Sequence, residues 1–344
     1  MNLCDFRQSL PRLWFHERFS PWLLPLLPLS WLFRAVTAIR RVLYRWGILP
    51  SVAPSVPVVV VGNLTVGGSG KTPLTLWLVK GLAERGRRPG IVSRGHGGDG
   101  AVRPVRPDAE AATVGDEPLL LARRSGVPVF VGRDRVAAAN ALLAAHPECD
   151  VLVADDGLQH YRLARRAEIA VFDRRGAGNG HLLPAGPLRE PLSRLAGVTA
   201  VVINGGIARV DPGGVPCFSM SLAGQRFVAL DDPRKTCSAA DLQGKSLHAL
   251  AGIGDPARFF CQLDRLGLRF SRHPFPDHRV YSAEDLSFAR DGVLLMTEKD
   301  AVKCVGLVLS EAWVLPVEAR VEDAPDGSSL LDGILEKLNG RAPL

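Results

Sequence analysis

Closely spaced cysteines are missing from this 344-residue chain. No two of its six cysteines form a C-x-x-C pair, so neither a disulfide framework nor a structural zinc site is expected. This favours a reducing cytosol. The composition, 47% hydrophobic and 22% charged, is globular, and the length allows two domains. The six residues are Cys4, Cys149, Cys217, Cys237, Cys261 and Cys304.

A long uninterrupted apolar run is also missing. Residues 10–49 are rich in Trp, Phe and Leu, but Pro21, Pro25 and Pro28 interrupt them and Arg34 closes the stretch. We therefore expect no run of the roughly 18–20 apolar residues that a spanning helix requires. A signal peptide is not expected either, because the apolar part starts late and no small-residue cleavage site follows.

Acidic residues are scarce in the first fifty positions, where seven arginines stand against only Asp5 and Glu17. Most of the net charge of +7 therefore lies at this end. Arginines mixed with tryptophans and leucines predict a helical segment over residues 1–50 that lies in a membrane interface. The alternative is a helical hairpin packed on the protein's own core. Nucleic acid is not an expected partner, since no nucleic-acid-binding motif accompanies the charge.

The most informative stretch is a phosphate-loop motif at residues 58–73. Four valines predict a strand buried on both faces, and the glycines after them let backbone N–H groups converge on an anion at the next helix's N-terminus. Lys71 would reach the β- and γ-phosphates, and Thr72 would hold Mg²⁺. Thr65 replaces the motif's first glycine, so a flexible turn with a surface lysine is the alternative. The predicted loop residues are Thr65, Val66, Gly67, Gly68, Ser69, Gly70, Lys71 and Thr72, with ATP and Mg²⁺ as ligands.

Short apolar runs alternate with helical patterns after this loop, which predicts an α/β fold with a doubly wound, mostly parallel sheet of the P-loop NTPase class. A weaker pattern near residues 205–245 predicts a boundary, followed by a smaller α/β domain. The predicted parts are residues 1–50, 51–235 and 236–344. Strands are expected at 88–93, 127–131, 150–154, 168–173, 199–204, 247–251, 293–297 and 313–317, and helices at 73–85, 116–125, 133–146 and 256–266.

Two carboxylates, Asp155 and Asp156, end an apolar strand, as in the second nucleotide motif whose aspartate holds Mg²⁺ directly or through water. They are the metal candidates, and a solvated turn is the alternative. His160 follows four residues later. It would orient a carboxylate or a water, or serve as a structural histidine.

Further polar groups occur in three places. Asp116 and Glu117 open a predicted helix, where Asp116 would be a cap or would accept a proton from an alcohol. Arg174, Arg175 and Arg189 lie in a Gly/Pro-rich loop after a strand and would bind a phosphorylated substrate, or remain solvated. His278 would meet Asp116 if the two domains close over the nucleotide. The last candidate stretch, residues 297–303, reads Thr-Glu-Lys-Asp-Ala-Val-Lys.

These motifs, in this order, resemble the tetraacyldisaccharide 4′-kinase family, the lipid A 4′-kinases of Gram-negative bacteria. That family also has Thr or Ser at the Thr65 position. The chain departs from the family's usual residues at His96, Ala177 and Asp255, where tyrosine, a bulky aromatic and asparagine are usual. The resemblance runs through residues 28–30, 43–44, 62–73, 93–95, 114–118, 155–160, 178–191, 251–254, 275–278 and 297–303.

The resemblance implies transfer of the ATP γ-phosphate to the 4′-hydroxyl of a tetraacylated glucosamine disaccharide 1-phosphate. It implies a peripheral, monotopic location on the cytoplasmic face of the inner membrane, and no protein partner is required. Asp116 becomes the expected base, His278 its partner, and Lys71 and Thr72 the phosphate and Mg²⁺ anchors. The expected substrate contacts are Asn63, Arg94, Glu117, His160, Arg174 and Arg189.

Two other classes compete with a kinase. A membrane-bound P-loop switch or scaffold ATPase of the partitioning type would carry an extra lysine before the paired glycines, where this chain has Val66. A lipid-binding protein that uses nucleotide only structurally would keep all its activity in an Asp116→Asn variant.

Overall fold

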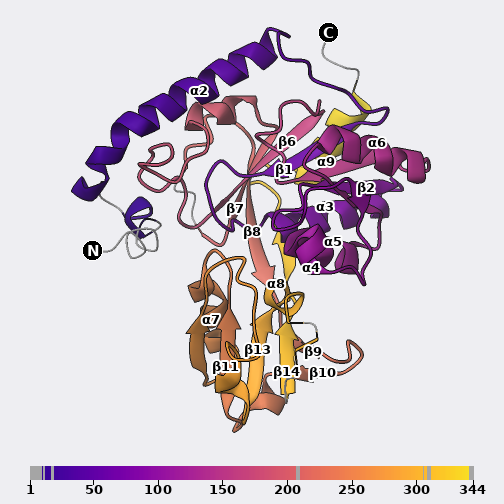
Figure 1. Ribbon diagram of the computed structural model, residues 1–344. Coiled ribbons are helices and arrows are strands. Elements are labelled where there is room, and N and C mark those ends of the chain that lie inside the picture. The colour runs from indigo at the N-terminus through magenta and orange to yellow at the C-terminus, as the bar shows by residue number, and fades with distance from the viewer. Residues whose placement is uncertain are drawn as a thin grey trace.

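The computed structural model describes residues 10, 12–16, 19–206, 210–304, 306–307 and 311–340. Arg7 and Arg18, which are part of the predicted basic segment, lie outside these ranges. The strands form two sheets, one of nine strands and one of six. Figure 1 shows the six-stranded sheet below the larger one, and helix α2 as an arm along the upper side.

The nine-stranded sheet carries the phosphate-loop motif near its centre. Its order is β15-β8-β7-β6-β1-β5-β2-β4-β3, parallel except at the two edge pairs, β15 with β8 and β3 with β4. This confirms the predicted doubly wound, mostly parallel sheet. The strands are β1 (Val58–Gly62), β2 (Pro89–Ser93), β3 (Arg103–Pro104), β4 (Val129–Val131), β5 (Val151–Asp155), β6 (Ala167–Asp173), β7 (Ala200–Asn204), β8 (Cys217–Ala223) and β15 (Glu318–Val321).

Both faces of this sheet are covered, which explains its continuous apolar strands. Val59 and Val61 belong to a core with helices α3, α5 and α9, whereas Val58 and Val60 belong to a second core with α6. Alternate side chains thus enter opposite cores, as a strand buried on both faces requires. The helices of this part are α3 (Lys71–Glu84), α4 (Ala111–Val114), α5 (Asp116–Ser125), α6 (Arg135–Ala145), α9 (Leu330–Asn339) and the 3₁₀ helix η2 (Leu192–Gly197).

The six-stranded sheet has the order β10-β9-β14-β13-β11-β12. Its strands are β9 (Arg226–Ala229), β10 (Thr236–Ser238), β11 (Leu247–Ala251), β12 (Ser271–Pro274), β13 (Val293–Thr297) and β14 (Glu311–Leu315). Helices α7 (Pro256–Arg265) and α8 (Glu298–Ala301) and the 3₁₀ helices η3 (Ala240–Leu242) and η4 (Ser287–Ala289) accompany it.

The chain changes sheets twice, between β8 and β9 and again between β14 and β15. The sequence prediction had a single change, at residues 235/236. Strand β15 returns to pair with β8, and α9 packs against α3, so the last part of the chain completes the first core. This return is a long-range pairing, which a local sequence pattern does not reveal.

The N-terminal segment forms a 3₁₀ helix, η1 (Pro21–Leu26), continued by α2 (Leu27–Arg45). The expectation that prolines interrupt this segment and Arg34 closes it is wrong. Pro21 and Pro28 lie in first turns, where proline is tolerated, Pro25 lies inside the 3₁₀ helix, and α2 continues past Arg34. By length and composition alone, the 25 residues from Pro21 to Arg45 suffice to cross a membrane. Only 11% of their most apolar window is buried.

Candidate functional site

The phosphate loop occupies the turn between β1 and α3. Gly70 precedes α3 with φ +93°, and a Cβ there would lie 2.1 Å from Asn204 Nδ2, so only glycine fits. The Asn204 amide donates to the Ser69 carbonyl oxygen at 2.9 Å. From the other side, the Val66 N–H donates to the Pro187 carbonyl oxygen at 2.9 Å. The predicted strand, loop and helix are therefore present and held from two sides.

Lys71 is the first residue of α3, directly after this turn, and only 8% of its side chain is exposed. Its Nζ is 3.6 Å from Asp156 Oδ1, and Arg189 Nη1 is 3.3 Å from the same oxygen. Burial raises the pKa of Asp156, but Lys71, Arg189 and Arg135 outweigh it and lower the pKa to about 2. Asp156 is therefore ionised and holds both cations beside the loop.

Asp155 ends β5, where its register opposite Val61 of β1 brings it to the phosphate loop. Thr75 Oγ1 donates to its Oδ1 at 3.1 Å, whereas Oδ2 has no hydrogen-bond partner among the described residues. Full burial, and then the charges of Glu117 and Asp156, raise the pKa of Asp155 to about 7. An unpaired buried carboxylate oxygen beside a phosphate loop fits a divalent cation bound by oxygen ligands, as predicted for Thr72, Asp155 and Asp156.

Asp116 and His278 meet across the two sheets. Asp116 is the first residue of α5, and its Oδ2 lies 3.2 Å from His278 Nδ1. Burial raises the pKa of Asp116, but the His278 hydrogen bond and the charge of Lys299 outweigh burial, so the net shift of the pKa is downward. The hydrogen bond to Asp116 in turn raises the pKa of His278. The His96 ring packs edge-on against His278, with centroids 4.9 Å apart.

A cavity of about 630 Å³ lies beside these groups, and His278 lines it, whereas Asp116 lines an adjoining cavity of about 440 Å³. The phosphate loop, Arg94, Glu117, Arg189 and the Asp277–His278 pair line the larger one. One wall comes from α2 through Phe33, Val36, Thr37 and Arg40. The phosphate loop and the N-terminal helix therefore open into the same space.

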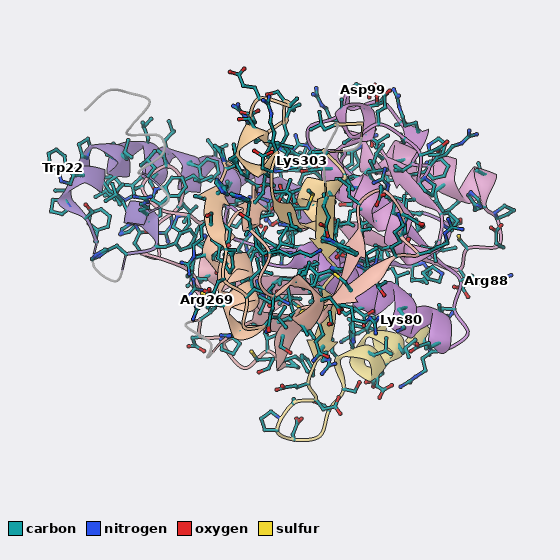
Figure 2. All side chains as sticks on the ribbon, turned by 90° about the horizontal axis from the view of Figure 1, so that it is seen from below. Trp22, Lys80, Arg88, Asp99, Arg269 and Lys303 are labelled. Carbon is teal, nitrogen blue, oxygen red and sulfur yellow. The ribbon has the colours of Figure 1, made fainter. Side chains whose placement is uncertain are left out.

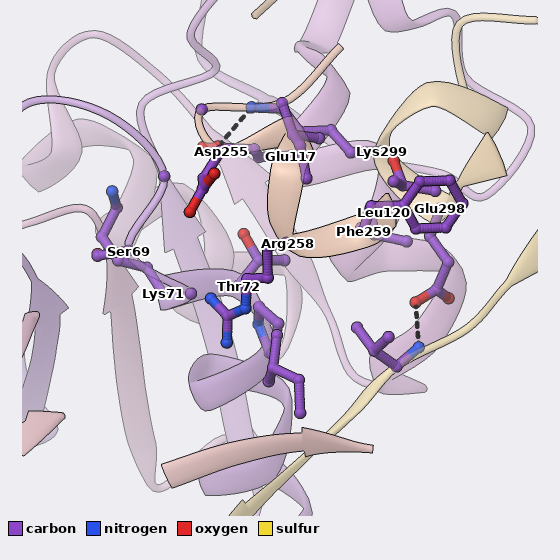
Figure 3. Close-up of a pocket in the computed structure, with 18 of the residues that line it drawn as sticks. Ser69, Lys71, Thr72, Glu117, Leu120, Asp255, Arg258, Phe259, Glu298 and Lys299 are labelled. Carbon is purple, nitrogen blue, oxygen red and sulfur yellow. Dashed lines mark hydrogen bonds and ion pairs between the residues drawn. The ribbon is translucent and has the colours of Figure 1, made fainter. Parts of the chain in front are cut away.

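A smaller cavity, about 170 Å³, lies on the other side of the phosphate loop, between the two sheets (Figure 3). The loop residues and Thr72 line it together with apolar side chains such as Leu120, Ile253 and Phe259. The close approach depends on glycine, because a Cβ on Gly254 would lie 2.4 Å from the backbone nitrogen of Gly68. The second sheet thus touches the phosphate loop directly.

The predicted substrate residues are not all placed alike. Arg94, Glu117 and Arg189 line the large cavity, whereas His160 and Arg174 are not among its lining residues. Arg174 is 58% exposed and pairs with Asp255 at 3.3 Å. Burial, followed by Arg135 and Arg165, lowers the pKa of His160 to about 4, so its ring stays neutral at neutral pH.

Asn63 lies under the phosphate loop. It is fully buried, and its Nδ2 donates to the Gly67 carbonyl oxygen at 3.2 Å. Its Oδ1 has no partner among the described residues. This placement makes Asn63 a support for the loop's backbone, and a contact with substrate stays a prediction.

Sequence reasoning missed a polar group that lines the large cavity. Glu190 is 2% exposed and accepts hydrogen bonds from the Tyr161 hydroxyl and from Gln159 Nε2, the latter at 3.3 Å. Tyr161 also contacts the Tyr44 ring of the N-terminal helix, with centroids 5.7 Å apart. A glutamate after Arg189 in a loop already singled out was the available signal.

Lys299 was also missed, although its stretch was noted. Its Nζ lies 3.0 Å from Glu117 Oε1, 3.0 Å from Asp277 Oδ1 and 3.8 Å from Asp116 Oδ2. Figure 3 shows Lys299 directed at Glu117 at the edge of the smaller cavity. Nothing in the local sequence indicates that these residues meet, because they belong to different sheets.

A glycine-rich phosphate loop at the central strand, a buried aspartate on the neighbouring strand, and an ionised carboxylate paired with histidine define a P-loop phosphotransferase. The family model for tetraacyldisaccharide-1-P 4′-kinase, LpxK, matches residues 22–336. The chain belongs to this family.

Similar proteins agree with this assignment. A tetraacyldisaccharide 4′-kinase of Dechloromonas aromatica is 56% identical over 96% of this chain and 98% of its own. One of Azoarcus is 52% identical over 94% of both. The crystal structure of LpxK from Aquifex aeolicus in complex with ATP has a TM-score of 0.76 at 30% identity, covering 92% of this chain and 99% of that one.

Proposed function

We propose that this protein transfers the γ-phosphate of ATP to the 4′-hydroxyl of a tetraacylated glucosamine disaccharide 1-phosphate. The observation that carries the proposal is the large cavity, which the phosphate loop, α2 and His278 line, with Asp116 Oδ2 3.2 Å from His278 Nδ1. An alcohol placed in this space would have a base, a bound triphosphate and an apolar wall at the same time. The family relationship and the ATP complex of the Aquifex enzyme support the same reaction.

Asp116 would act as the base. Its carboxylate is ionised at neutral pH, because its pKa lies below the ordinary value. It would take the proton of the 4′-hydroxyl as the hydroxyl oxygen bonds to the γ-phosphorus and the bond to the β–γ bridging oxygen breaks, leaving ADP. His278, whose Nδ1 is hydrogen-bonded to Asp116 Oδ2, would hold the carboxylate in place and stabilise its charge.

The triphosphate would bind along residues 65–72. The backbone N–H groups of the loop and the Lys71 ammonium would face the phosphate oxygens. These oxygens would replace part of the contact that Lys71 makes with Asp156. Thr72 with Asp155 or Asp156 would hold Mg²⁺, which would supply charge neutralisation between the β- and γ-phosphates. Arg94 and Arg189 would face phosphate groups of the acceptor or donor.

The acceptor's acyl chains require a membrane, because each CH₂ removed from water contributes about 0.8 kcal/mol. The N-terminal helices meet this need with large exposed apolar side chains. Figure 2 shows Trp22 at the far end of the arm. The most exposed apolar side chains of these helices and of the turn after α2 are Trp22 (71%), Trp31 (62%), Leu32 (61%), Ile39 (59%), Trp46 (72%) and Ile48 (61%).

A peripheral position fits these helices better than a transmembrane one. Ser30 is 3% exposed and its hydroxyl donates to the Leu182 carbonyl oxygen at 2.8 Å, and Phe33 packs against the core of the larger sheet. A helix docked on the protein along one side offers only its other side to lipid. Arg34, Arg41 and Arg45 would then meet anionic headgroups on the cytoplasmic face of the inner membrane.

The test is transfer of labelled γ-phosphate from ATP to a tetraacyl disaccharide 1-phosphate in detergent micelles. Wild-type protein should form phosphorylated lipid, and both Lys71→Ala and Asp116→Asn should lose it. ATP hydrolysis without lipid product would instead support the membrane switch, and an unchanged Asp116→Asn variant would support the lipid-binding class.

A further inference from the structure

We propose that Lys299 is the positioning residue that assembles the acid–base pair across the two sheets. This inference rests on the proposed function. The Lys299 ammonium contacts carboxylates of Asp116, Glu117 and Asp277 at once, at 3.8, 3.0 and 3.0 Å. The Lys299 ammonium therefore links Asp116 to Asp277, the residue that precedes His278.

The Lys299 contacts join the two sheets. Asp116 and Glu117 begin α5 on the larger sheet, whereas Asp277 and Lys299 belong to the smaller one. Asp277 immediately precedes His278, whose backbone lies in the left-handed region at φ +59°. Fixing Asp277 therefore fixes the loop that carries the histidine, and the same ammonium fixes the carboxylate that the histidine must meet.

Lys299 is well placed to hold this geometry because its own backbone is anchored. The neighbouring Glu298 pairs with Arg124 of α5, and its second carboxylate oxygen accepts from the Val317 N–H at 3.1 Å. Helix α8 thus docks on α5 through two consecutive side chains, both of which line the smaller cavity.

The charge of Lys299 also favours the ionised form of Asp116. Lys299 is 15% exposed, and its three carboxylate partners outweigh burial and raise its pKa, so it keeps its proton. The other cationic groups near Asp116 are His278 and, at longer range, Lys303. The neighbouring anions are Glu117 and Asp277, and His96 packs against the His278 ring. Without Lys299, the two anions would favour the protonated form of Asp116.

The experiment compares Lys299→Met, Lys299→Arg and wild type in lipid phosphorylation across pH, in detergent micelles. Lys299→Met should lower kcat about 10²-fold, the cost of misplacing a catalytic group. It should also shift the acidic limb of the pH profile of kcat/KM to higher pH by about one unit, because Asp116 loses a nearby cation. Lys299→Arg keeps the charge and should retain the wild-type limb with a smaller loss of rate.

Two controls keep the result interpretable. Lys245→Met removes an exposed ion pair with Glu311, 2.9 Å in length, from the same sheet and should leave rate and pH profile unchanged. Asp277→Asn removes one partner but not the cation, so it should lower the rate without raising the acidic limb. It also replaces Lys299→Met as the test if that variant does not fold.

The outcomes separate the two proposals. Wild-type protein that forms no phosphorylated lipid overturns the proposed function itself. An active wild type together with a folded Lys299→Met variant of unchanged rate, or of reduced rate with an unmoved acidic limb, overturns the positioning role alone. A rise of the acidic limb in Asp277→Asn would also contradict it.

Discussion

The two sheets contribute to the site in different ways. The larger sheet supplies the phosphate loop, Lys71 and Asp155 from positions buried in its core. The smaller sheet supplies His278 and Lys299 from a loop and a four-residue helix at its edge. The proposed nucleotide site is thus built largely into the larger sheet, whereas the proposed acid–base pair forms only where the two sheets meet. A change at the junction should therefore affect transfer more than nucleotide binding.

The largest expected effect is on the larger sheet. Lys71→Ala should reduce lipid phosphorylation about 10³-fold or more and weaken ATP binding as well, because the ammonium meets the phosphates in both states. Steady-state kinetics with calorimetric titration of ATP would check both losses. Intact ATP affinity in this variant would remove Lys71 from the nucleotide site.

At the junction, Gly254→Ala should reduce kcat about 10²-fold. Its Cβ would lie 2.4 Å from the Gly68 backbone nitrogen, so the smaller sheet must move away from the loop, and with it His278. Gly333→Ala in α9 is the matched control, since a Cβ there has nothing within 4 Å. Equal rates for the two variants would mean that the sheets need not approach so closely.

The exposed side chains of the N-terminal arm that do not line the large cavity are expected to matter for location only. Leu32→Ala should weaken binding to anionic vesicles about tenfold, from a loss of roughly 1.5 kcal/mol of apolar burial in the bilayer. Val102→Ala, which also shortens an exposed apolar side chain but lies on the larger sheet's side, should bind as wild type does. Vesicle flotation would measure both, and equal binding would place the membrane contact elsewhere.

The smallest effect concerns stability and pH. The folded-state pKa of His278 is raised, so its contact with Asp116 contributes fully below the unfolded pKa and is lost as pH rises through the folded one. His278→Gln should therefore destabilise the protein more at about pH 6 than at about pH 9 in urea unfolding. A destabilisation that grows with pH would contradict the ion pair.

The central elements were predictable from sequence because local patterns determine them. Four valines before a glycine-rich loop predict β1, and the apolar run before the carboxylates predicts β5, which the structure places beside it. The Asp116–His278 contact was also expected, but only as a consequence of domain closure. Its confirmed part is the geometry, 3.2 Å between Nδ1 and Oδ2.

The remaining features depend on packing between distant segments. The return of β15 to β8 joins residues about a hundred positions apart, and Pro28 is tolerated in α2 because it falls in the first turn. The Lys299 cluster likewise forms by contact between two sheets. His160 shows the reverse case, a residue in a strong motif that does not line the cavity.

The most direct test of the account is a single-turnover measurement of phosphate transfer to the lipid in Asp116→Asn, beside its affinity for ATP. The account predicts a loss of about 10²–10⁴-fold in transfer with ATP affinity close to wild type, because Asp116 acts on the acceptor hydroxyl. Transfer at the wild-type rate, or a parallel loss of ATP affinity, would contradict it.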